Sequence, residues 1–287
     1  MSRCVVGLWL LLTCSLAAAE LSTLAGPAMG TTYRVALAAD IPGMTRGEVH
    51  RDVEAVLARI DRAASTWRND SDASRFNRAA VGEWVAVSKD LVTLVETARE
   101  IHEQSEGAFD ITVGPAGSGR PTGMRHVVSR LSPPALRKSV PGIAIDLGGI
   151  GPGYAVDRIG ERLVSLGSKA HLVELGGEVR AWGQPSKSRT WRVRLTAADA
   201  GQGHSREIDL ADGEAVATST CRPGRSPIDP RTGRPVTASR PRRAATVRAT
   251  TCAAADAWAV AAIVLDLAPD RDGTITMPEQ LRSAQGP

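Results

Sequence analysis

The chain has 287 residues, of which 43% are hydrophobic and 23% are charged, and its formal net charge is +4. These values are ordinary for a globular protein, and the length is sufficient for one large domain or two lobes. The basic residues are scattered, apart from a cluster at Arg240, Arg242 and Arg243 that is typical of a solvated loop. The composition therefore gives no indication of nucleic-acid binding.

The N-terminal segment predicts export. Arg3 precedes an apolar run that ends at Leu16, and three alanines follow that run. This arrangement is typical of a cleaved signal peptide, and the run is too short for a membrane span. We therefore expect residues 1–19 to be a signal peptide and residues 20–287 to form the mature domain, in the periplasm or attached to the inner membrane. Acylation of Cys14, as in a lipoprotein, is the alternative.

Two cysteines, Cys221 and Cys252, remain after such cleavage. In an oxidising compartment they could pair, although a disulfide needs a geometry that the sequence does not specify. The cysteines have no spacing that is typical of a metal site.

The first half of the mature chain predicts a strand followed by two helices. Apolar and polar residues alternate over 32–38, which predicts a half-buried strand. Apolar residues recur at helical spacing over 47–64 and over about 88–104, so each range is expected to form a helix with one buried face. A polar loop is expected at 65–72. Residues 116–142 are rich in Pro, Ser, Arg and Gly, and are expected to be a surface connection with at most one short helix.

The second half predicts short strands and two further helices, at 155–166 and at about 253–265. The expected strands lie at 171–183, which Gly176 and Gly177 divide into two, and at 191–196, 205–210, 215–219 and 245–250. A turn is expected at 228–233. Strands and helices alternate irregularly, which indicates an α+β fold rather than a regular doubly wound sheet.

The segment from Ile145 to Asp157 has four glycines between a short apolar strand signal and an amphipathic helix. Glycines let backbone N–H groups approach an anion closely, and the helix that follows adds the positive end of its dipole. The spacing differs from the dinucleotide fingerprint, and Asp146 precedes the glycines instead of following them. The segment predicts a phosphate or nucleotide site, with an ordinary tight turn as the alternative.

Several motifs occur in a specific order along the mature chain. They are Met29 to Tyr33, Ser65 to Arg68 with Phe76 and Asn77, Gly107 to Asp110, Asp146 to Asp157, Glu174 to Arg180, Ile228 to Gly233, and Ala255 with Asp256. As an ordered set they resemble the FAD:protein FMN transferase (ApbE) family over nearly all of the mature chain. The resemblance implies mixed sheets with packed helices in two closely joined lobes.

The resemblance also implies an activity. Members of the family bind FAD and Mg²⁺, transfer FMN to a threonine hydroxyl of an exported redox protein, and release AMP. Such chemistry needs a held pyrophosphate, a hard cation with oxygen ligands, and an acceptor hydroxyl in line with the phosphorus. The expected partners are therefore FAD and a periplasmic or membrane redox protein.

Site residues follow from the same resemblance. It implies FAD contacts at Met29, Trp67, Ala108, Phe109, Asp110 and Asp146, and Mg²⁺ ligands at the Gly149 carbonyl and the Asp256 carboxylate. Trp67 stands where relatives often have Tyr, and it would stack on an aromatic ring. Each position also has an ordinary interpretation, with Met29 as an apolar residue at a strand end, Phe109 as core, Asp146 as a turn cap and Gly149 as a tight turn. No catalytic residue is assigned.

Three positions depart from the family pattern. Val260, one helical turn after Asp256, has no side-chain oxygen where relatives have Thr for the metal. Pro152 replaces a Lys and removes a backbone donor, and Ser226 replaces a His that could transfer a proton. The alternatives to a working transferase are therefore a catalytically weak or inactive FAD-binding relative and an FAD pyrophosphatase.

Overall fold

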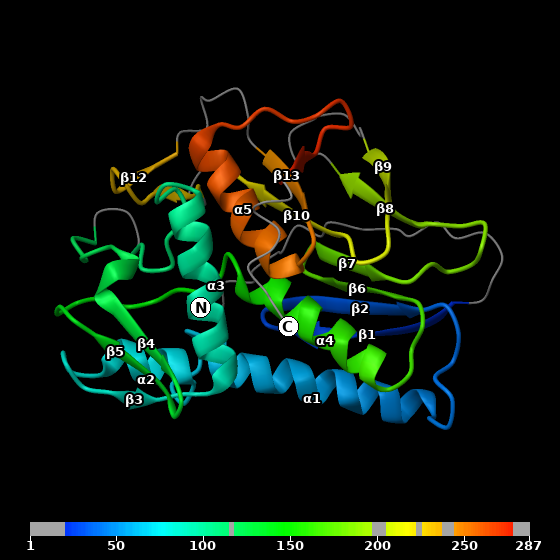
Figure 1. The fold of residues 1–287 in the computed structure, drawn as a ribbon, viewed down its shortest axis with the longest axis horizontal. Coiled ribbons are helices and arrows are strands. Elements are labelled where there is room, and N and C mark those ends of the chain that lie inside the picture. The colour runs from blue at the N-terminus through cyan, green and yellow to red at the C-terminus, as the bar shows by residue number, and fades with distance from the viewer. Residues whose placement is uncertain (1–20, 115–117, 197–204, 222–225, 237–243, 278–287) are drawn as a thin grey trace, which may run out of the picture.

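The computed structural model describes residues 21–114, 118–196, 205–221, 226–236 and 244–277 (Figure 1). The predicted signal peptide, Cys14 and the arginine cluster of residues 240–243 lie outside these ranges. Within them, no helix is both long enough and apolar enough to cross a membrane.

Strands and helices alternate irregularly along the described chain, as the α+β prediction requires. The α-helices are α1 (Arg46–Ala64), α2 (Asp72–Arg78), α3 (Lys89–Gln104), α4 (Gly151–Ser165) and α5 (Cys252–Leu265), with a 3₁₀ helix at Met124–His126. The strands are β1 (Ser22–Ala28), β2 (Thr31–Leu37), β3 (Val85–Ala86), β4 (Val127–Leu131), β5 (Pro134–Lys138), β6 (His171–Leu175), β7 (Glu178–Trp182), β8 (Trp191–Thr196), β9 (Ser205–Leu210), β10 (Ala215–Thr220), β11 (Ile228–Asp229), β12 (Arg234–Pro235), β13 (Ala244–Ala249) and β14 (Ile275–Thr276). Every strand and helix predicted from periodicity is present, within a few residues of its expected range.

A seven-stranded sheet forms the larger lobe, with the strand order β1-β2-β6-β7-β10-β13-β14. Its neighbouring strands are antiparallel except β13 and β14, which are parallel, so the sheet is mixed. Helices α4 and α5 pack on one face, and α1 packs on the outer side of α4 (Figure 1). The β8–β9 hairpin covers the opposite face through Trp191, Val193, Ile208 and Leu210.

The smaller lobe contains α2 and the three-stranded sheet β3-β5-β4. Helix α3 joins the lobes, because it packs both on α5 and on the β4–β5 hairpin (Figure 1). One continuous core includes Val127 and Leu136 from this lobe together with Val35 and Val247 from the large sheet. The two lobes are therefore closely joined, as predicted.

The expectation of a strand-free connection over 116–142 is wrong. The hairpin of β4 and β5 lies in this range, with Val127 opposite Lys138 and Leu131 opposite Pro134. Lys138 takes one of the buried positions, and its Nζ donates to the carbonyls of Asn77 and Ile143. Because a charged residue stands at a buried position, the sequence lacks the apolar–polar alternation that predicts a strand.

The possible disulfide is also absent. Cys221 and Cys252 are both buried and free. The Cys221 thiol lies 3.1 Å from Ser226 Oγ, whereas the Cys252 thiol faces the carbonyl of Val179. The two thiols serve as small buried side chains at separate places in the core.

Burial changes the titration of His171 on β6. Its ring stacks on that of Trp182, with centroids 4.9 Å apart, and Ser168 Oγ lies 2.9 Å from its Nδ1. Burial lowers the pKa of His171 from 6.5 to about 4, and a hydrogen bond with the Gly160 backbone and the charge of Asp212 offset only part of this effect. The folded protein therefore holds this imidazole neutral.

We expect His171 to make folding sensitive to acid. Since the unfolded chain binds a proton near pH 6.5 and the folded chain only near pH 4, the stability from the neutral ring is present above pH 6.5 and is lost as the pH falls to 4. The expected loss is about 3 kcal/mol. Urea unfolding of the wild type and of His171→Gln checks this, because the effects of other shifted groups cancel in the difference. A difference that stays constant with pH would contradict the expectation.

Candidate functional site

A cavity of about 590 Å³ opens where the β1–β2 turn, the end of α1 and the start of α4 meet. Its lining includes Met29, Trp67, Asp146 and Pro152, which come from three distant parts of the sequence. Three of these residues are predicted FAD contacts. The volume is typical of a small-molecule site.

Met29 lies in the turn between β1 and β2 in a left-handed conformation, with φ of 48°. Its Cε lies 3.8 Å from the point that a Cβ of Gly151 would occupy, so the side chain covers the start of α4. Trp67 lies in the loop after α1 and is 95% exposed. An indole that is exposed at the edge of a cavity favours stacking on a ligand over a role in the core.

Asp146 lies at the other side of the cavity, and two contacts hold its backbone in place. Its N–H donates to the carbonyl of Ile111 at 2.7 Å. The Asn77 side chain binds both the N–H and the carbonyl of the preceding Ile145, at 2.7 and 2.9 Å. Asp146 Oδ1 accepts from the Gly148 N–H at 2.9 Å, so the residue caps the turn and also faces the cavity.

Three predicted FAD contacts do not line this cavity. Ala108, Phe109 and Asp110 are buried behind it. Asp110 Oδ1 accepts from the N–H and the hydroxyl of Thr112, at 2.7 and 2.6 Å, and His102 Nδ1 lies 3.5 Å from Oδ2. Thr112 thus satisfies one oxygen of the carboxylate, and all three residues are buried outside the lining of this cavity.

Two N–H groups of the glycine-rich segment donate within the protein, and one of its glycines lies at a close helix crossing. The N–H of Gly151 donates to Leu147 O at 2.7 Å, and the N–H of Gly153 donates to Asp256 Oδ2 at 3.1 Å. Pro152 has no N–H. A Cβ on Gly153 would lie 2.3 Å from Cys252 O, so glycine is required where α4 crosses α5. The N–H groups of Gly151 and Gly153 are therefore taken up within the protein, whereas Gly148 and the start of α4 line the cavity.

The predicted metal ligands both lie beside this helix crossing, Asp256 against Gly153 and Gly149 against Val260. Asp256 is buried, and burial, together with the charge of Asp157, raises its pKa to about 7. The Gly153 N–H, which donates to the carboxylate, partly opposes this shift. A Cβ on Gly149 would lie 3.1 Å from Val260 Cγ2, so Val260 fills the space beside this glycine. No cluster of three or more His, Cys, Asp or Glu suited to a metal occurs among the residues that the structure describes.

Asp157 has a structural role that the sequence did not reveal. From α4, its two oxygens accept the N–H groups of Cys252 and Ala253 at 2.9 Å each, so it caps α5. Arg180 pairs with the same carboxylate at 2.6 Å. Asp157 and Arg180 both lie in the ordered motifs, which was the only signal for them in the sequence. The pair fixes the start of the helix that carries Asp256.

The comparisons with known proteins agree with this fold. The ApbE family model matches residues 29–272, and the chain belongs to the ApbE family. An FAD:protein FMN transferase of Vibrio cholerae is 32% identical over 224 residues, which cover 70% of this chain and 66% of that protein. One from Klebsiella pneumoniae is 29% identical over 281 residues, which cover 86% of this chain and 79% of that protein.

Solved structures show the same fold. The flavin transferase ApbE from Vibrio cholerae superposes with a TM-score of 0.77 at 30% identity, covering 89% of each chain. The apo flavinyl transferase ApbE from Pseudomonas stutzeri gives 0.75 at 30% identity, covering 88% of this chain and 86% of that one. The chain spans 66% of the length of the Vibrio cholerae relative and 61% of that of a Haemophilus influenzae relative. The ApbE-like fold is confirmed.

Proposed function

We propose that the protein is an FAD:protein FMN transferase, which moves FMN from FAD to a threonine hydroxyl of an exported redox protein and releases AMP. Membership of the ApbE family supports the proposal. The observation that carries it is the single cavity that unites Met29, Trp67 and Asp146. The apolar segment before residue 20 supports export, to the periplasm or to the inner membrane surface.

In this reaction the acceptor hydroxyl oxygen attacks the phosphorus of the FMN half of FAD. The bond from that phosphorus to the oxygen shared with AMP breaks, and the hydroxyl proton is lost. Trp67 would stack on a ring of FAD, and Met29 and Asp146 would hold the nucleotide at the start of α4. Most of the catalysis then comes from holding the phosphorus and the hydroxyl in line.

The residues at the helix crossing fit Mg²⁺ as a site with two protein ligands. Asp256 Oδ1 accepts no hydrogen bond from any described residue, and its buried charge would be offset by a cation. The Gly149 carbonyl would be the second ligand. Mg²⁺ keeps several waters and takes substrate phosphate oxygens, so two protein ligands are sufficient. When bound, the ion would neutralise charge that develops on the phosphate oxygens.

Stacking by Trp67 can be tested by calorimetry of FAD binding. We expect the wild type to bind one FAD and Trp67→Ala to bind it about tenfold more weakly, because the variant loses a stacking partner. Trp84→Ala is the matched control, since Trp84 is also partly exposed but lies outside the cavity. Equal losses in the two variants, or no saturable binding by the wild type, would overturn the assignment of the cavity.

Restoring an oxygen at position 260 should strengthen the metal site. We expect Val260→Thr to bind Mg²⁺ about tenfold more tightly in the presence of FAD, since a hydroxyl would replace a methyl group beside Gly149. Calorimetric titration with Mg²⁺ measures this. Val164→Thr makes the same chemical change at a position on α4 that is 51% exposed. An unchanged affinity in Val260→Thr would show that Val260 does not face the ion.

Two alternatives use the same cavity, and the departures at Val260, Pro152 and Ser226 support the second of them. An FAD pyrophosphatase would use water in place of the threonine hydroxyl, and would release free FMN and AMP. A weak or inactive relative would bind FAD and leave it intact. The products formed in the presence of an acceptor protein distinguish these from the transferase.

A further inference from the structure

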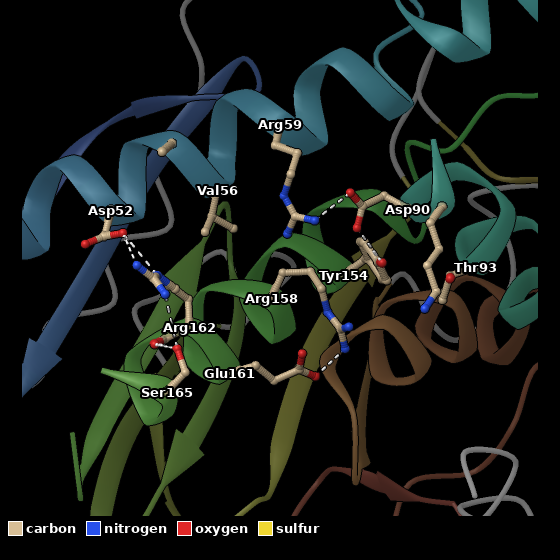
Figure 2. Close-up of a pocket in the computed structure, with 12 residues that line it drawn as sticks. Asp52, Val56, Arg59, Asp90, Thr93, Tyr154, Arg158, Glu161, Arg162 and Ser165 are labelled. Atoms are coloured by element: carbon tan, nitrogen blue, oxygen red, sulfur yellow. Dashed lines mark hydrogen bonds and ion pairs between the residues drawn. The ribbon is translucent and has the colours of Figure 1, made fainter. Parts of the chain in front are cut away.

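A second cavity, of about 570 Å³, lies between α1, α3 and α4 (Figure 2). It is separate from the FAD cavity, although α1 and α4 contribute residues to both. Tyr154 and Arg158 line it from α4, whereas Gly151 and Pro152 of the same helix line the first cavity. The proposed transfer reaction uses none of the residues of this second cavity.

Charged side chains dominate its lining. The cationic residues are Arg59, Lys89, Arg158 and Arg162, and the carboxylates are Asp52, Asp90 and Glu161. Three ion pairs form across or along the helices, between Arg59 and Asp90 at 2.7 Å, between Arg162 and Asp52 at 2.6 Å, and between Arg158 and Glu161. Figure 2 shows Arg59, Arg158 and Glu161 extending into the same space. One positive charge is left over.

Two cationic side chains in the lining have hydrogen-bond donors that lack an acceptor among the described residues. The ammonium group of Lys89 makes no hydrogen bond or ion pair with the part of the chain that the structure describes. Arg158 also lines the cavity, where its guanidinium pairs with Glu161 and lies over the Tyr154 ring, and its buried Nε has no acceptor among the described residues. The two oxygens of Asp90 accept from Arg59 and from the Tyr154 hydroxyl, and neither accepts from Lys89 or Arg158. The cavity thus offers charged donors that an incoming anion would satisfy.

The other residues that line the cavity indicate which chemical groups a ligand would carry. Thr93, Ser165 and the carboxylates can accept hydrogen bonds from ligand hydroxyls, and Val56 gives a small apolar wall. A phosphate matches the Lys89 and Arg158 donors, whereas hydroxyl groups match the carboxylates. We propose that this cavity is a second ligand site for a phosphorylated, hydroxyl-bearing small molecule of the sugar-phosphate class.

Calorimetry with ribose 5-phosphate as the probe tests this proposal. FAD is kept saturating and Mg²⁺ is removed, so that the first cavity is filled and no transfer occurs. We expect one probe molecule to bind, and Lys89→Gln and Arg158→Gln each to weaken binding by about tenfold. Lys89→Gln removes no hydrogen bond or ion pair within the described fold, and its urea unfolding curve, expected to match that of the wild type, separates a loss of binding from a loss of stability.

Two controls test where the probe binds and whether its phosphate group is required. Lys187→Gln removes an equal charge from an exposed loop, so it should bind the probe as the wild type does. Ribose without the phosphate should not bind. The absence of saturable binding in the millimolar range, equal binding of ribose, or an unchanged affinity in Lys89→Gln would each overturn the proposal.

Discussion

Replacing Asp256 with alanine is expected to lower the rate of FMN transfer by about 100-fold or more. This carboxylate is buried at the crossing of α4 and α5, and burial raises its pKa to about 7. It is also the one acidic side chain that we place as a ligand of Mg²⁺. Its loss would leave the charge that develops on the phosphate oxygens without a fixed cation. The initial rate of acceptor labelling at saturating FAD measures the effect.

The matched control is Asp40→Ala, because Asp40 is exposed in the loop between β2 and α1. This variant should keep the wild-type rate. FAD binding should persist in Asp256→Ala, since Met29, Trp67 and Asp146 are unchanged. A transfer rate in Asp256→Ala within a few-fold of the wild type would contradict the assigned role of the carboxylate.

Gly153→Ala is expected to lower the free energy of unfolding by about 3 kcal/mol. The added Cβ would lie 2.3 Å from Cys252 O and 2.9 Å from Ala253 N. Both of these atoms belong to the backbone of α5, which Asp157 holds at 2.9 Å, so neither can move aside easily. Chemical denaturation of the purified variant measures the loss.

Gly47→Ala provides the comparison within the same protein. Gly47 lies in the first turn of α1, and a Cβ there would meet nothing within 4 Å. Alanine favours a helix over glycine by up to about 1 kcal/mol, so this variant should be as stable as the wild type or more stable. Equal losses in Gly153→Ala and Gly47→Ala would show that the close helix crossing is not the reason for Gly153.

Much of the fold could be predicted because local signals agree with tertiary packing. Helices α1 and α3 follow apolar residues at helical spacing, and each begins at a residue, Thr45 or Ser88, whose side chain accepts a first-turn N–H. The β4–β5 hairpin could not be predicted in this way. Lys138 can be buried in that hairpin because its ammonium group donates to the carbonyls of Asn77 and Ile143. No local sequence pattern shows that these acceptors lie nearby.

The site, like the fold, was predictable only where the signal is in the sequence itself. The ordered motifs led to Met29, Trp67 and Asp146, and the structure brings these residues to one cavity. They also indicated the glycine-rich segment, but one of its N–H groups, that of Gly153, is taken by a distant side chain. The acceptor of the Gly153 N–H is Asp256, which lies 103 positions later in the chain. Whether a backbone donor is free for a ligand depends on such distant contacts, which the spacing of glycines does not show.

The central claim is tested most directly by intact-mass analysis of an exported flavoprotein acceptor after incubation with this protein, FAD and Mg²⁺. We predict that the acceptor gains one FMN on a threonine, that AMP is released in equal amount, and that omission of Mg²⁺ strongly slows both. FAD that binds saturably but yields neither the adduct nor AMP would contradict the transferase assignment. Free FMN and AMP without an adduct would contradict it equally and identify a pyrophosphatase.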